Sequence, residues 1–256
     1  MSREQTAEET QVFEFQTLYI DPFAGAAGDM INAALVDLGV SLKPLQTVLK
    51  GLGYRSLSAH CEITQKQHLR AAHFIVSAEE ADIPEYLSLQ QLRNIFAAAA
   101  VSEQVRERAQ NILSTLASGE SRAHGVPPEE VHFHELGGLD TVVDVLGACI
   151  GFAAIAPKNI YVGPLPAQRG AWKMSHGMYP LPAPVTLEII AQAGLFVQET
   201  SEVFPPDIEL VTPTGAALLA EFAKPGSGTM QVQRIGYGAG TRDLPAPNIL
   251  RIWAGK

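Results

Sequence analysis

Two histidines and a glutamate, His132, His134 and Glu135, form the most distinctive group of metal-binding side chains in the sequence. In an extended segment, residues two positions apart point to the same side, so both imidazoles would face one way while Phe133 faces the core. Imidazole suits nickel, zinc, iron or copper. The spacing predicts a divalent metal site. His176, in a proline-rich stretch, is a further candidate ligand, the alternative being an ordinary surface histidine.

Two aspartates follow this group at helical spacing. Asp140 and Asp144 are four positions apart, so they share one face of the apolar helix expected here. A buried carboxylate without a partner is costly, and a metal or a neighbouring histidine would relieve that cost. We predict that both are catalytic or metal-binding carboxylates. The alternative is structural, with Asp140 capping the helix and Asp144 bonded to a histidine.

A second motif joins an expected strand to an expected helix through small residues. Asp21 ends the strand, Gly25 and Gly28 lie in the turn, and Asp29 stands at the helix start. Backbone N–H groups and the helix dipole converge at such a turn, which makes it a candidate anion site with two candidate catalytic carboxylates. It lacks the lysine of a P-loop and the glycine spacing of a dinucleotide site. The alternative is a glycine turn with an aspartate cap.

A third motif precedes another expected helix. The hydroxyls of Thr212 and Thr214, with Gly215 beside them, stand at a helix N-terminus and suit a phosphate or carboxylate. The alternative is ordinary N-capping by Thr212, with Pro213 in the first helical position.

These motifs need a scaffold of alternating strands and helices. The pattern of apolar residues predicts a fold of the α/β class, with α+β as the alternative, built as a mixed sheet with flanking helices. Residues 1–15 form a loose leader and 16–256 one domain. Strands are expected at 16–20, 57–63, 68–76, 230–235 and 248–253. Helices are expected at 29–38, 41–52, 89–100, 102–117, 141–155, 184–193 and 214–222.

The composition excludes several classes of function. A net charge of −9 and the lack of a Lys/Arg cluster argue against a nucleic-acid partner or an anionic membrane surface. No apolar run is long enough to span a bilayer. The two cysteines form no metal or disulfide motif, which favours a cytoplasmic location.

Five ordered motifs together resemble the LarC family over about residues 17–253. The family inserts nickel into pyridinium-3,5-bisthiocarboxylic acid mononucleotide, forming Ni–S bonds and a Ni–C bond of the nickel-pincer cofactor of lactate racemase. The resemblance implies a lyase-type cyclometallase that uses CTP with Mn(II) or Mg(II). The motifs lie at residues 18–30, 131–144, 176–184, 210–215 and 236–241.

Two departures from the family pattern qualify this expectation. The stretch 77–89 contains none of the histidines that many relatives carry there, and the chain ends at Lys256, where full-length relatives continue into a CTP-binding domain. We therefore expect a homo-oligomer that needs a separate C-terminal, CTP-binding chain for turnover. The alternatives are a non-catalytic nickel carrier or partner-binding module and, from the histidine pair alone, a metal-dependent hydrolase. Such a hydrolase usually requires further histidines and a carboxylate on later strands, whereas only His176 follows His134.

Overall fold

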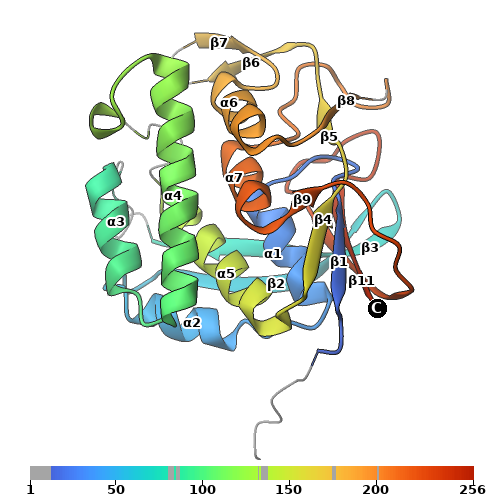
Figure 1. The fold of residues 1–256 in the computed structure, drawn as a ribbon, viewed down its shortest axis with the longest axis horizontal. Coiled ribbons are helices and arrows are strands. Elements are labelled where there is room, and N and C mark those ends of the chain that lie inside the picture. The colour runs from blue at the N-terminus through green and yellow to red at the C-terminus, as the bar shows by residue number, and fades with distance from the viewer. Residues whose placement is uncertain are drawn as a thin grey trace, which may run out of the picture.

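A seven-stranded mixed sheet with helices stacked beside it forms the body of the protein (Figure 1). The computed structural model describes residues 13–79, 84, 87–131, 133, 138–174, 177–200 and 202–256. The strand order is β2-β3-β10-β11-β1-β4-β9. The expected α/β class, with a mixed sheet and flanking helices, is confirmed.

The main sheet combines parallel and antiparallel pairs. Strand β1 runs antiparallel to β11 and parallel to β4, and β3 runs parallel to β10. A short parallel pair, β5 with β8, and a small antiparallel hairpin, β6 with β7, lie outside this sheet. The strands are β1 (Thr17–Asp21), β2 (Ser58–Lys66), β3 (Leu69–Ser77), β4 (Asn159–Val162), β5 (Leu165–Ala167), β6 (Ala171–Met174), β7 (Gly177–Pro180), β8 (Val197–Glu199), β9 (Lys224–Pro225), β10 (Val232–Ala239) and β11 (Ile249–Gly255).

The described helices lie close to the positions predicted from the apolar pattern. They are α1 (Gly28–Asp37), α2 (Lys43–Lys50), α3 (Leu89–Ala98), α4 (Glu103–His124), α5 (Leu139–Ile155), α6 (Pro184–Ala193) and α7 (Pro213–Phe222), with a 3-10 turn at Pro128–Glu130. Helix α4 is longer than predicted. It passes through Gly119, which faces Ile189 of α6, and ends only at Gly125, whose φ is +68°. Packing against α6 therefore outweighs the low helix propensity of this glycine.

The core lies between the sheet and the helices. Alternate residues of the central strands, Leu18 and Ile20 on β1 and Leu250 and Ile252 on β11, are fully buried. Helix α1 packs on β3, β10 and β11, and α5 packs on α1. Helices α6 and α7 contact each other and α4. Burial of this apolar surface supplies the main driving force for folding.

A glycine on β10 determines how close α1 lies to the sheet. A Cβ atom on Gly238 would stand 1.9 Å from the carbonyl oxygen of Met30, so no larger residue fits. The glycine-rich run at 236–240, part of the last of the five motifs, thus contains a close contact between helix and strand. This contact fixes the position of the N-terminal turn of α1.

Candidate functional site

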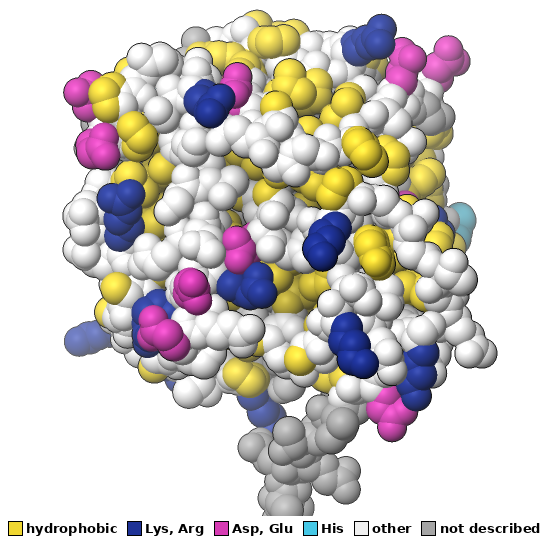
Figure 2. All heavy atoms as spheres, viewed as in Figure 1, with side chains coloured by type: hydrophobic (Ala, Val, Ile, Leu, Met, Phe, Trp, Pro, Cys, Tyr) yellow, Lys and Arg dark blue, Asp and Glu magenta, His cyan; other side chains and the backbone are white. Residues whose placement is uncertain are grey.

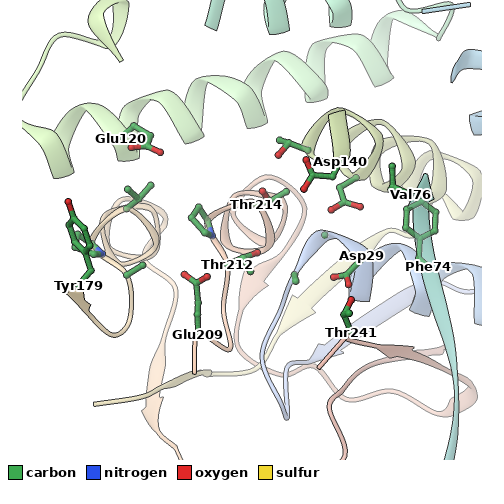
Figure 3. A pocket seen from close by; sticks show the side chains of 18 of the residues that line it. Asp29, Phe74, Val76, Glu120, Asp140, Tyr179, Glu209, Thr212, Thr214 and Thr241 are labelled. Atoms are coloured by element: carbon green, nitrogen blue, oxygen red, sulfur yellow. The ribbon is translucent and has the colours of Figure 1, made fainter. Parts of the chain in front are cut away.

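A cavity of about 570 Å³ opens between the helix layer and one end of the sheet (Figure 3). Its walls come from the first turns of α1, α5, α6 and α7, the last turns of α4, strand β3, and the loops that follow β7 and β10. No lysine or arginine occurs among the described residues of its lining. Polar or titratable side chains in the lining are Asp29, His73, Glu120, His124, Asp140, Thr141, Asp144, Tyr179, Glu209, Thr212, Thr214 and Thr241.

Four helices direct their N-termini towards this cavity. The first residues of α1, α5, α6 and α7 are Gly28, Leu139, Pro184 and Pro213, and each helix contributes first-turn residues to the lining. Each helix is at least ten residues long, and its N-terminus carries a partial positive charge with unsatisfied N–H groups. Together they make the cavity a candidate site for an anion with more than one charged group.

Backbone hydrogen bonds hold the N-termini of α1 and α7 side by side. Ala26 donates its N–H to the carbonyl oxygen of Leu210 at 3.0 Å, and Thr212 donates to the carbonyl oxygen of Ala26 at 3.0 Å. At the start of α7, the Thr212 hydroxyl accepts the N–H of Gly215 at 3.1 Å. The alternative reading of Thr212 as a helix cap is therefore confirmed, and Gly215 itself does not line the cavity.

Three aspartates form the acidic part of the cavity. Asp29 lies in the first turn of α1, and Asp140 and Asp144 lie one turn apart on α5. Burial raises the pKa of Asp144 well above its ordinary value, and the charges of Asp29 and Asp140 raise it further. Burial also raises the pKa of Asp29, against a hydrogen bond from the Met30 N–H at 2.8 Å. A bound cation would offset both the desolvation and the mutual repulsion.

We predict that Asp144→Asn stabilises the metal-free protein at pH 8 by about 1–3 kcal/mol, because it removes a poorly solvated charge. The pKa of Asp144 is raised in the folded state, so stability is greatest below the ordinary aspartate pKa and falls as pH rises through the folded pKa. Thermal unfolding in EDTA should give a higher Tm for the variant at pH 8 and none of this advantage near pH 4. An equal or lower Tm at pH 8 would contradict this.

The structure brings six of the predicted site residues to one cavity. They are Gly28, Asp29, Asp140, Asp144, Thr212 and Thr214. Asp21 and Gly25 do not line it: Asp21 forms an ion pair with Arg251 on the sheet, and Gly25 lies in the turn against Leu210. The buried ring of Phe133 confirms that this side chain faces the core.

The predicted metal ligands His132, His134, Glu135 and His176 lie outside the described residues. Within the described ranges, no three His, Cys, Asp or Glu side chains are grouped closely enough to hold a metal ion. A metal at the aspartates would therefore need further ligands from elsewhere.

Several lining residues were not singled out from the sequence. Glu120 is one of them, and it carried a signal, because it continues the buried face of α4 formed by Leu113, Leu116 and Ala117. An acidic residue on such a face is unusual and points to a site. Thr241, which forms a hydrogen bond with Asp29, ends the motif at 236–241 but was assigned no role, because it reaches the cavity through the loop between β10 and β11.

The fold and the cavity together define a class of protein. Four helix N-termini favour an anion, while the three clustered aspartates favour a cation, and both features lie in one cavity. In an α/β fold, such a cavity suits an anionic small molecule bound beside a metal ion. In the described residues, none of the helices has both the length and the apolar character required to cross a membrane.

Comparison with known proteins agrees with this class and makes it specific. The sequence profile described as "Nickel insertion protein" matches residues 18–256, and the chain belongs to that family. A Thermomicrobium roseum protein named for nickel insertion is 41% identical over 244 residues, covering 93% of this chain and 57% of the relative.

Two relatives carry a name that includes the substrate. Proteins of Desulfitobacterium hafniense and Staphylococcus epidermidis, each named pyridinium-3,5-bisthiocarboxylic acid mononucleotide nickel insertion protein, are both 35% identical. Their alignments span 240 and 241 residues, 93% of this chain and 58% of each relative. The chain thus spans less than three-fifths of these relatives. No solved structure matches it.

Proposed function

We propose that this chain holds nickel and an anionic pyridinium mononucleotide in one cavity and takes part in inserting the metal into that mononucleotide. The observation that carries the proposal is the meeting of four helix N-termini and three aspartates in one space. The family membership and the names of the Desulfitobacterium and Staphylococcus relatives support the choice of metal and substrate.

The two parts of the cavity have complementary tasks in this proposal. Asp29, Asp140 and Asp144 hold Ni(II) before its transfer to the substrate, with His132 and His134 as further ligands, because these two residues closely precede α5 in the sequence. The first turn of α7 binds the phosphate. Thr214 is 7% exposed, lines the cavity, and has no hydrogen bond from its hydroxyl to another described residue. The substrate's sulfur atoms are soft ligands that then take the nickel.

Turnover requires more than this cavity in our proposal. A CTP-binding part, supplied as a separate C-terminal chain, uses CTP with Mn(II) or Mg(II), and the cytoplasmic assembly is a homo-oligomer. This chain covers 57–58% of the named relatives, so we assign to it only the metal and mononucleotide site.

The proposal is tested by reconstitution with Ni(II), Mn(II), the bisthiocarboxylic acid mononucleotide, CTP and the C-terminal part of a relative. Formation of the nickelated product, followed by mass spectrometry, should require this chain and both metals. The alternative is a nickel carrier, which would bind Ni(II) equally well but give no product under any combination. A chain that binds neither nickel nor the mononucleotide would refute both functions.

We predict that Thr214→Val weakens binding of a pyridinium mononucleotide about 10-fold and leaves nickel affinity unchanged. The substitution keeps the shape but removes a hydroxyl that donates to the phosphate, and one such bond to a charged group contributes about 1.5–3 kcal/mol. Calorimetry with nicotinic acid mononucleotide measures the effect. The control is Thr47→Val on α2, which also removes a helix hydroxyl, here one that donates to the Lys43 carbonyl oxygen at 2.9 Å. Equal weakening by both variants would argue against a phosphate contact.

A further inference from the structure

The far wall of the cavity carries a buried carboxylate that the proposed function does not use. Glu120, near the end of α4, is 6% exposed and lines the cavity. Figure 3 shows it on the helix that crosses above the cavity, set apart from Asp29 and Asp140. A carboxylate is rarely buried without a specific task, because its desolvation is costly.

The packing of α4 on α6 fixes the place of this carboxylate. Gly119, the residue before it, faces Ile189 and Val185 of α6, and the Ser118 hydroxyl donates to Oε1 of Gln192 at 2.8 Å. One turn further on, Nε2 of His124 lies 3.2 Å from Oε2 of Glu120. The pair is thus held at a rigid helix crossing, which suits recognition of a ligand.

The electrostatics of this wall restrict what it can recognise. The negative charge of Glu120 disfavours the phosphate and thiocarboxylate groups of a mononucleotide at this wall, and the imidazole of His124 lies beside it. A carboxylate accepts hydrogen bonds at about four lone-pair positions, so the neutral groups that suit it are those rich in donors. In a ribonucleotide that group is the pair of hydroxyls at C2′ and C3′, on the sugar edge opposite the ring oxygen.

We propose that Glu120, held by His124, binds the vicinal ribose hydroxyls of the mononucleotide and so selects a ribonucleotide over sugar-less or deoxygenated pyridinium compounds. This inference rests on the proposed function, because it assumes a mononucleotide in the cavity. A carboxylate that accepts from ribose hydroxyls is a recognised device in nucleotide sites. In this protein the carboxylate lies near the C-terminus of a long helix, which differs from its place in dinucleotide-binding folds.

The test compares two probes, nicotinic acid mononucleotide and its 2′,3′-dideoxy counterpart, by calorimetry on the full chain. The wild-type protein should bind the ribose form about 10- to 100-fold more tightly, as expected for hydrogen bonds to a charged acceptor. Glu120→Gln, which preserves size, should reduce this preference to about threefold or less. Glu103→Gln, on the same helix but exposed and paired with Arg106, should retain it in full.

Each outcome has a distinct meaning. A wild-type protein that binds both probes equally, or a Glu120→Gln variant that keeps the full preference, would overturn the ribose assignment and leave the proposed function intact. A wild-type protein that binds neither probe would overturn the proposed function, and the assignment with it. The wild-type comparison needs no variant to fold, and a merely structural role for Glu120 would not change the ratio between the probes.

Discussion

Replacing Asp29 and Asp144 together by asparagine is expected to raise the Ni(II) dissociation constant about 100-fold or more. Both side chains line the cavity, and the charge of Asp29 raises the pKa of Asp144, which places the two carboxylates within electrostatic reach of each other. A divalent cation gains most where poorly solvated negative charges have no other compensation. Loss of both charges therefore removes much of the attraction for the metal.

The measurement is Ni(II) competition against a chromophoric chelator at pH 8. Asp243→Asn is the matched control: Asp243 is an exposed aspartate paired with Lys66 and is not part of the cavity lining. Unchanged Ni(II) affinity in the double variant would show that the two aspartates do not bind the metal. His132 and His134 would then be the remaining candidate ligands.

Gly215→Ala is expected to destabilise the protein by about 2–4 kcal/mol, as severe overpacking does in a core. A Cβ atom at this position would lie 2.1 Å from the carbonyl oxygen of Ala26, and backbone atoms cannot move away as a side chain can. The substitution therefore separates the N-termini of α1 and α7 and opens the cavity. Both stability and mononucleotide binding should fall.

Thermal unfolding should show a Tm lower by about 5–15 °C, given 2–4 °C per kcal/mol for a domain of this size. Gly51→Ala is the control, because a Cβ atom there meets only the Val48 carbonyl oxygen at 3.3 Å. A Gly215→Ala protein as stable as the control would show that the two helix N-termini are not tightly packed.

Local patterns in the sequence predicted most of the elements. The small-residue turn before Asp29 and the threonine at 212 marked the starts of α1 and α7 to within one residue. Periodicity is a local property, and each of these helices buries one apolar face. Strands were predicted at 57–63 and 68–76, but β2 extends to Lys66 and the turn lies at Gln67 and His68, both with positive φ. A positive φ is uncommon outside glycine, and no glycine marks this turn.

The assembly of the site was much harder to predict. The contact between Ala26 and Val211 joins segments 185 residues apart in the sequence, and it holds the N-termini of α1 and α7 side by side. Asp21 was grouped with Asp29 because they flank one turn, yet the strand direction carries Asp21 to Arg251 and away from the cavity. Which residues a side chain contacts across the fold depends on tertiary packing, and no local sequence pattern encodes that packing.

The most direct test of one shared cavity for metal and mononucleotide is anomalous diffraction at the nickel edge from crystals soaked with Ni(II) and nicotinic acid mononucleotide. We predict a nickel peak bounded by Asp29, Asp140 and Asp144, with the phosphate of the mononucleotide at the first turn of α7 in the same cavity. Nickel and mononucleotide bound in separate places, with no nickel peak at these aspartates, would contradict the account.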